Sequence, residues 1–165
     1  KIDAYLVPTD DFHASEYVGE YFKCRKYITG FTGSAGRAVI MQDMAGLWTD
    51  GRYFIQAAAQ LEGTGVELFK MGEPDVPTVH QFLEEKLGEG MCLGFDGRTV
   101  SAEEADELTE PHEPGRIARS DPVFFIEIAP PGTEFSIDIF RECDSISTIE
   151  RKGKAFSIKT GGKKT

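Results

Sequence analysis

Short apolar runs alternate with helix-forming segments over the first two thirds of the chain, and this alternation restricts the fold more than any other feature. The runs have the length of strands and span residues 4–7, 38–41, 46–49, 66–69 and 91–95. Four residues separate the second run from the third, which is short enough for a hairpin between antiparallel strands. The pattern predicts a three-layer α/β/α domain, in which one mixed sheet has helices on both faces.

Three helices are predicted between or after these strands. Asp50 can cap a helix, one face of which then carries Phe54, Ala57, Ala58 and Leu61. Pro77 and Thr78 open a second helix that Gly88 closes. Ser101 and Glu104 have the spacing of a capping box, which predicts a third helix to about Thr109.

The character of the chain changes after residue 109. Residues 1–110 are expected to form one domain, and residues 111–151 are a divergent segment rich in proline and glycine, with a possible last strand at 123–126. Residues 152–165 are basic and poor in apolar side chains, so we expect them to form a disordered tail.

The charge of the chain excludes one class of partner. The net charge is −10, and residues 1–110 carry 20 acidic against 9 basic side chains. Like charge opposes the phosphate backbone, so we expect no nucleic-acid partner. No apolar run approaches the roughly 18 residues of a transmembrane helix, and the first residues lack the apolar stretch of a signal peptide. We therefore expect no membrane association.

Three cysteines, Cys24, Cys92 and Cys143, are widely spaced along the chain. An odd and sparse set is typical of reduced thiols in a cytosolic protein, so a cytoplasmic location is expected.

Residues 30–36 are rich in glycine, as many phosphate-binding loops are. This glycine-rich segment does not fit a phosphate-binding loop, because no lysine follows its last glycine. Thr32 also stands where a nucleophile elbow needs glycine, so Ser34 is not expected to be a nucleophile. The segment is better explained as a tight turn that leads into a strand at Arg37, with glycines supplying positive φ.

Two readings are open for the segment from Trp48 to Tyr53. In the structural one, Asp50 caps a helix and Arg52 reaches back to a strand end. In the functional one, Arg52 faces a peptide carboxylate or a partner subunit, with Asp50 and Trp48 beside it, because arginine suits planar anions. Trp48 is expected to be buried, and a surface position would favour the contact role.

Metal-binding and catalytic residues are not expected in this chain. His13, His80 and His112 are scattered, and no His-Glu-x-x-His motif occurs. Asp10 and Asp11 are adjacent carboxylates, but nothing near them in sequence completes a shell of oxygen ligands.

Three segments together resemble the N-terminal domain shared by creatinases, prolidases and Xaa-Pro aminopeptidases. The first is Ala-Tyr-Leu-Val-Pro at 4–8, followed by Ser-Glu-Tyr at 15–17. The second is Tyr-Ile-Thr-Gly-Phe-Thr-Gly-Ser-Ala-Gly at 27–36, and the third is Leu-Trp-Thr-Asp-Gly-Arg-Tyr-Phe-Ile-Gln-Ala at 47–57. Their order and spacing over residues 3–110 are similar to those of the long, cytosolic type of Xaa-Pro aminopeptidase.

The resemblance implies a two-part metallopeptidase that removes an N-terminal residue when proline follows it. In that family, a C-terminal domain of the pita-bread fold holds two metal ions, usually manganese, with two Asp, one His and two Glu. This chain would be the non-catalytic N-terminal domain, which shapes substrate access and subunit contacts in a full-length homodimer. A stand-alone binding module and a nonfunctional fragment without peptidase activity remain as alternatives.

The resemblance ends near residue 110, where the family continues with a further strand and helix and then the metal domain. Residues 111–165 match no recognisable part of the family, as a gene fragment, a frameshifted end or a mispredicted exon would produce. Peptidase activity is therefore expected of a parent protein and not of this chain alone.

Overall fold

A mixed five-stranded sheet forms the centre of the molecule. The computed structural model describes residues 2–11, 13, 17–88 and 91–109, together with four strands between residues 126 and 161. The central strands are β1 (Ala4–Val7), β2 (Arg37–Met41), β3 (Ala45–Thr49), β4 (Val66–Lys70) and β5 (Leu93–Phe95), in the order β4-β3-β2-β1-β5. The pairs β1/β2 and β2/β3 are antiparallel, whereas β3/β4 and β1/β5 are parallel. The predicted mixed sheet, with its β2–β3 hairpin, is confirmed.

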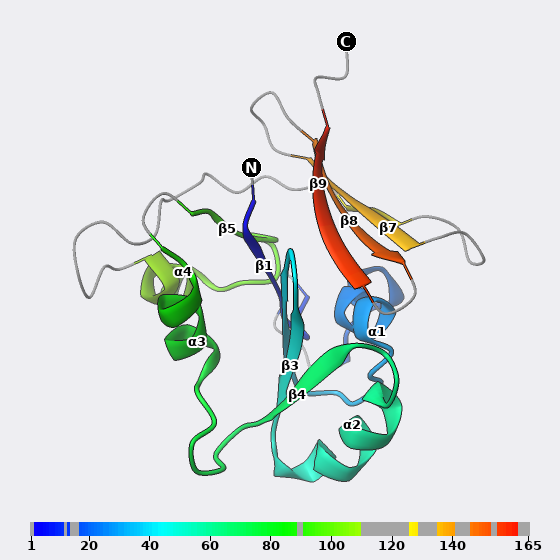
Figure 1. The fold of residues 1–165 in the computed structure, drawn as a ribbon, viewed down its shortest axis with the longest axis vertical. Coiled ribbons are helices and arrows are strands. Elements are labelled where there is room, and N and C mark those ends of the chain that lie inside the picture. Colours follow the sequence, from blue (N-terminus) through cyan, green and yellow to red (C-terminus); the bar gives the residue numbers. More distant parts are fainter. Residues whose placement is uncertain are drawn as a thin grey trace.

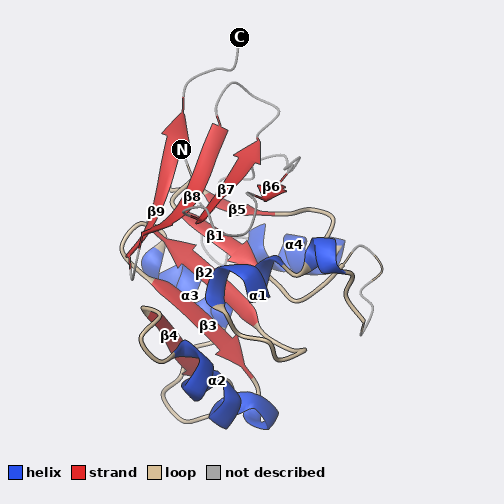
Figure 2. Cartoon of the chain, turned by 90° about the vertical axis from the view of Figure 1, so that its right-hand side faces the viewer, coloured by secondary structure: helices blue, strands red, loops and turns tan. Residues whose placement is uncertain are grey.

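Helices cover both faces of this sheet (Figures 1 and 2). They are α1 (Cys24–Thr29), α2 (Phe54–Leu61), α3 (Val79–Lys86) and α4 (Ala102–Thr109). Alternate side chains of β1 enter opposite cores, because successive residues of a strand point to opposite faces. Tyr5 and Val7 pack with α1 and α2, and Leu6 packs with α3 and α4. The three-layer α/β/α architecture is therefore confirmed.

Side-chain caps fix the starts of two helices; a cap was predicted at Ser101, and the one at Thr78 was not. The Thr78 hydroxyl accepts a 3.1 Å hydrogen bond from the Gln81 amide, and the Gln81 side chain accepts one of 2.9 Å from the Thr78 amide. The Ser101 hydroxyl likewise accepts from the Glu104 amide at 3.1 Å. Each cap satisfies backbone donors that the first turn of a helix leaves without partners.

The face predicted for α2 is partly wrong. Ala57 and Leu61 are buried, but Ala58 is exposed and Phe54 is only half buried. A short 3₁₀ helix, η2 (Gly51–Tyr53), precedes α2. The four predicted residues all lie within α2, and its buried stripe is the narrower one of Ala57 and Leu61, which are one turn apart.

The end of the chain forms a second, antiparallel sheet in the order β6-β7-β8-β9. Its strands are β6 (Ile126–Ile128), β7 (Phe135–Phe140), β8 (Ile146–Lys152) and β9 (Ala155–Gly161). The disordered tail expected for residues 152–165 is therefore wrong over β9. Residues 156–159 alternate apolar and polar types, which is the period of a strand, and β9 pairs with β8 along its length.

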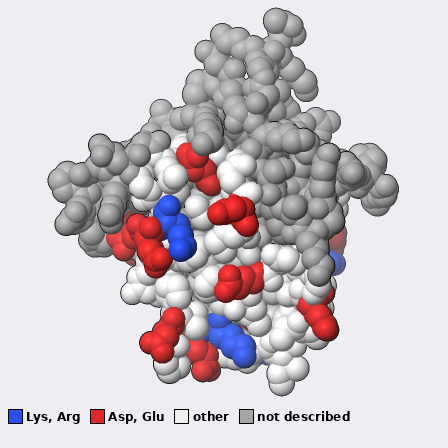
Figure 3. Space-filling model, in the orientation of Figure 1, with Lys and Arg blue, Asp and Glu red and all other residues white. Residues whose placement is uncertain are grey.

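The possible last strand at 123–126 meets β6 only at Ile126, and residues 123–125 lie outside the described residues. The surface of the described part is acidic, and carboxylates predominate on the face drawn in Figure 3. None of the helices within the described ranges is long and apolar enough to span a membrane.

Candidate functional site

One edge of the central sheet collects the polar segments that the sequence singles out. Strands β1, β3 and β5 run in the same direction, so their carboxyl ends meet at this edge. We define the carboxyl edge as Thr9 after β1, residues 30–36 before β2, residues 50–53 after β3 and residues 96–98 after β5. Segments distant in sequence thereby become neighbours.

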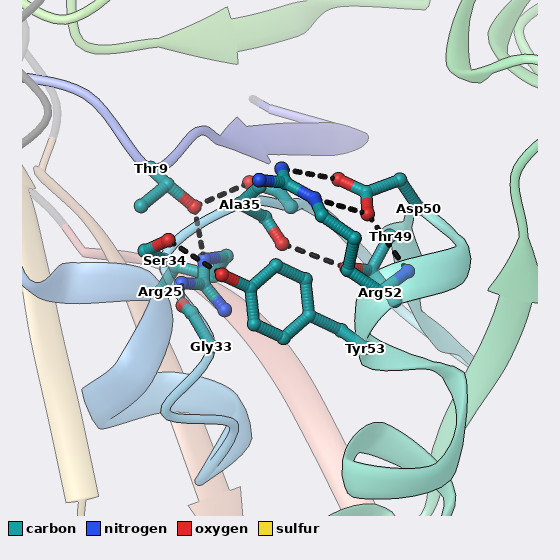
Figure 4. Close-up of polar contacts among 10 residues, drawn as sticks. Thr9, Arg25, Gly33, Ser34, Ala35, Thr49, Asp50, Arg52 and Tyr53 are labelled. Carbon is teal, nitrogen blue, oxygen red and sulfur yellow. Dashed lines mark hydrogen bonds and ion pairs between the residues drawn. The ribbon is translucent and has the colours of Figure 1, made fainter.

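Arg25 lies beneath the glycine-rich segment and binds its backbone (Figure 4). Its Nη1 donates to the Phe31 carbonyl at 3.3 Å, and its Nη2 donates to the Gly33 carbonyl. Its Nε donates to the Thr9 hydroxyl, and its guanidinium lies over the Phe31 ring, 4.8 Å from the centroid. Arg25 is 3% exposed, so these bonds form away from water, where each is stronger.

Side chains at the ends of two strands also hold this segment. The Thr9 hydroxyl donates to the Gly36 carbonyl at 2.6 Å, and the Thr49 hydroxyl donates to the Ala35 carbonyl at 2.7 Å. Residues 30–36 are thus fixed by groups that follow β1, end β3 and belong to α1.

Helix α2 fixes the tip of the segment at Thr32. The Gln60 side-chain oxygen accepts from the Thr32 amide at 2.9 Å, and the Gln56 side chain donates to the Thr32 hydroxyl at 2.9 Å. The tip is therefore tied to the outer helical layer as well as to the sheet.

Two glycines explain why this segment is rich in that residue. Gly30 ends α1 with a φ of 80°, a conformation that costs other residues energy. A Cβ on Gly33 would lie 2.3 Å from the Phe31 ring and 2.8 Å from the Tyr53 ring. The expected tight turn is confirmed, and the Ser34 hydroxyl is hydrogen-bonded to a phenol, that of Tyr53, at 2.7 Å.

Asp50 and Arg52 form a rigid pair at the start of η2. Asp50 accepts from the Arg52 amide at 3.0 Å, from its Nε at 2.9 Å and from its Nη2 at 2.8 Å. These bonds lower the pKa of the Asp50 carboxyl. The Arg52 side chain is 69% exposed, and its guanidinium lies 5.2 Å from the centre of the Tyr53 ring. The cap at Asp50 is confirmed, and Arg52 binds that cap rather than a strand end.

Trp48 lies in the hydrophobic core between the sheet and helices α3 and α4, away from the exposed pair of Asp50 and Arg52. Its ring is fully buried, stacks on Phe69 at 4.1 Å between centroids and meets Phe82 edge-on at 5.0 Å. Its indole Nε1 donates to the Pro77 carbonyl at 2.8 Å. The predicted burial is confirmed, so Trp48 offers no surface for a substrate or subunit, and only Asp50 and Arg52 remain as candidates.

A second Asp-Gly-Arg triplet after β5 repeats the arrangement. Asp96 accepts from the Arg98 amide and Nε, both at 3.0 Å, and from Nη2 at 2.6 Å. The Arg98 guanidinium lies 5.7 Å from the ring centres of Tyr21 and Phe22. The sequence reasoning missed Arg98, although the repeated triplet after two apolar runs was a visible signal. It also missed Arg25, for which the sequence holds no comparable signal.

Metal ligands do not gather in the described part of the chain, where no three His, Cys, Asp or Glu side chains are grouped to hold an ion. His80 joins α3 to α4 through a 2.9 Å hydrogen bond between its Nε2 and the Glu107 carbonyl. Cys24 and Cys92 are free thiols, and burial raises the pKa of Cys24 to about 11. His112 and Cys143 lie outside the described residues.

Comparison with known proteins agrees with this architecture. The family model of the creatinase/prolidase N-terminal domain matches residues 1–122. Aminopeptidase P2 of Arabidopsis thaliana is 48% identical over 109 residues, which cover 66% of this chain and 15% of that protein. The crystal structure of X-prolyl aminopeptidase from Caenorhabditis elegans, described as a cytosolic enzyme with a di-nuclear active site, superposes with a TM-score of 0.61. It is 39% identical and the match covers 65% of this chain and 17% of that one.

A further relative corrects the expectation for residues 111–165. A probable Xaa-Pro aminopeptidase P of Coprinopsis cinerea (strain Okayama-7) is 36% identical over 177 aligned positions, which cover 95% of this chain and 28% of that protein. Most of the C-terminal segment therefore has a counterpart in a relative, although it lacks the glycine and tryptophan motifs by which the sequence was recognised. The chain spans less than a third of each of these proteins. Its N-terminal domain is related to Xaa-Pro aminopeptidases, and the chain belongs to the creatinase/prolidase N-terminal domain family.

Proposed function

We propose that this chain is the non-catalytic N-terminal domain of a Xaa-Pro aminopeptidase and that its carboxyl edge contacts the peptide substrate or a partner subunit. The observation that carries the proposal is the fixed presentation of Arg52. Asp50 holds the guanidinium at two of its nitrogens, and Tyr53 lies beneath it, while most of the side chain remains exposed. A group already held in one orientation loses little conformational entropy when it forms a contact.

The backbone beneath this pair supports the same role. The Tyr53 hydroxyl is bound to Ser34, and Ser34 belongs to the segment that Arg25, Thr9 and Thr49 fix. A surface that must orient a peptide loses effect when it shifts by about 1 Å, so rigidity of this kind serves positioning. It does not supply a nucleophile or a base.

The hydrolytic chemistry is assigned to another part of a longer protein. A two-metal hydrolase needs several carboxylates and usually a histidine that converge on ions about 3.5–4 Å apart. The described residues contain no such group, so they do not fit the two manganese ions that the family implies. We assign those ions to a catalytic domain outside this chain, as in the di-nuclear active site of the C. elegans enzyme. We further propose that the full-length enzyme acts on peptides with proline at the second position, forms a homodimer and is located in the cytoplasm.

A chimera tests this function. Residues 1–109 of this chain would replace the matching segment of the C. elegans X-prolyl aminopeptidase, and kcat, KM and the subunit dissociation constant would be measured with an Xaa-Pro peptide. We expect an active chimera. Arg52→Ala should raise KM or the dissociation constant about fivefold or more, because buried arginine contacts are often worth over 1 kcal/mol.

Lys86→Ala on α3 is the matched control, since it removes an exposed cation away from the carboxyl edge. An Arg52→Ala chimera with unchanged kinetics and association would contradict the role of Arg52. A folded chimera with no activity would favour the alternative of a stand-alone binding module.

A further inference from the structure

A cavity of about 410 Å³ opens between α1 and the glycine-rich segment, and part of the carboxyl edge, Thr9 and residues 32–34, lines it. Three of its lining residues carry positive charge, namely Lys23, Arg25 and Lys26. Among the described residues that line it, none is acidic. This composition is unusual for a chain of net charge −10, in which 28 acidic side chains face 18 basic ones. The cavity is therefore a positive site on an acidic protein.

Arg25 places a buried positive charge in the wall of this cavity. Its hydrogen-bond partners in the described part of the chain are the Thr9 hydroxyl and the carbonyls of Phe31 and Gly33, all of which are neutral. Burial lowers its pKa to about 10, against smaller opposing effects of Tyr53 and Asp10. A buried cation whose hydrogen-bond partners are all neutral is costly, and an anion that reaches it relieves that cost.

Holding the glycine-rich segment does not use all of the donors of Arg25. A guanidinium carries five N–H groups, and the bonds to Thr9, Phe31 and Gly33 use three of them. The loop role and an anion role are therefore compatible in one side chain.

The two lysines that line the cavity, Lys23 and Lys26, differ in their ion pairs. Lys23 forms an ion pair with Glu20, so its charge is partly neutralised. Lys26 lies in the last turn of α1 and forms no ion pair with a carboxylate among the described residues, so its ammonium adds positive charge to the cavity lining. Long-range repulsion from the acidic body disfavours anions of high charge, so a singly charged, planar group suits this pair of cations best.

We propose that this cavity binds a carboxylate, which pairs with Arg25 and Lys26 while the adjoining apolar part of the ligand lies against Tyr17 and Phe22. Both aromatic residues line the cavity, and Tyr17 is 88% exposed. The free carboxyl end of a short peptide and the side chain of a glutamate share this chemistry. The site is independent of the proposed function, because it requires neither a catalytic domain nor a second subunit.

An NMR titration of the full 165-residue chain tests the site. The probes are acetyl-Ala-Leu with a free carboxylate and its carboxamide, followed by acetyl-Ala-Glu-Leu-amide and its glutamine analogue. We expect a carboxylate probe to shift the amide signals of Thr9, Gly33 and Ser34 and to bind at least fivefold more tightly than its neutral partner. The pair that shows this difference identifies the source of the carboxylate. Equal binding of both members in both pairs, or no shifts at these amides, would overturn the proposal.

Two substitutions complete the test. Lys26→Gln should weaken carboxylate binding about three- to fivefold, the range of an exposed charge interaction, and Lys86→Gln on α3 should leave it unchanged. Arg25→Gln should abolish binding, and a folded spectrum of this variant is checked first because Arg25 also holds the loop. If that variant does not fold, the comparison of Lys26→Gln with Lys86→Gln decides alone. Equal effects of these two would contradict the site.

Discussion

Trp48 fills the core between the sheet and α3, where its ring is fully buried. Its ring contacts Phe69 and Phe82, and its indole nitrogen is bound to the Pro77 carbonyl. Trp48→Ala should lower the free energy of unfolding by about 3–5 kcal/mol, because it leaves a cavity and an unpaired carbonyl. Urea denaturation measures this change. A loss below about 1 kcal/mol would place the ring outside the core.

Cys24 should react slowly with alkylating reagents in the folded chain. Burial raises the pKa of its thiol to about 11, so at pH 8 its thiolate is roughly a hundredfold scarcer than that of an ordinary cysteine. Its rate with iodoacetamide would be measured in a Cys92→Ser, Cys143→Ser background, folded and in guanidinium. Equal rates in the two states would refute the burial of this thiol.

The same shift has a consequence for stability. A raised pKa in the folded state means that the neutral thiol is favoured there, so its contribution is present below pH 9 and declines as the pH rises toward 11.

The roles of some residues could be predicted from the sequence, and those of others could not. The cap at Asp50 and the burial of Trp48 depend on near neighbours in sequence, and both predictions are confirmed. Arg25 could not be recognised, because its partners Thr9 and Gly33 reach it only through the packing of α1 against the strand ends.

At the scale of elements, the glycine-rich segment is a tight turn that needs glycine at position 33. Gly33→Ala should lower the free energy of unfolding by about 1–3 kcal/mol, since its methyl group would overlap the rings of Phe31 and Tyr53. Gly88→Ala is the control, because a Cβ there meets no atom of a described residue within 4 Å, and it should change stability by less than about 0.5 kcal/mol. Thermal unfolding of both variants checks this. Similar effects at the two positions would show that Gly33 is not tightly packed.

Elements with a strong local pattern were predictable, and those that depend on tertiary partners were not. All five central strands and the capped helices α3 and α4 follow apolar runs and side-chain caps in the sequence. Helix α1 has only six residues and no clear apolar period, so its position depends on packing against the sheet. Strand β9 was missed because its basic composition concealed a short alternating pattern that pairs with β8.

At the scale of the whole molecule, the alternation of strands and helices was enough to predict three layers and a mixed sheet. It was not enough to predict the carboxyl edge, where Thr9, the glycine-rich segment and the two Asp-Gly-Arg triplets meet, since strand order brings these segments together. The proposed contact role of this edge likewise depends on the whole domain, and the described residues hold no group of metal ligands.

The most direct test of this account is the activity of the chain by itself. The purified 165-residue chain, supplied with manganese, would be incubated with an Xaa-Pro peptide, and release of the first residue would be followed over time. We expect no release above a blank, because a two-metal hydrolase needs converging carboxylates and histidine, and the described residues supply no such group. Turnover that depends on manganese, and that persists when the chain is purified from a host lacking its own Xaa-Pro peptidases, would contradict the assignment of this chain as a non-catalytic domain.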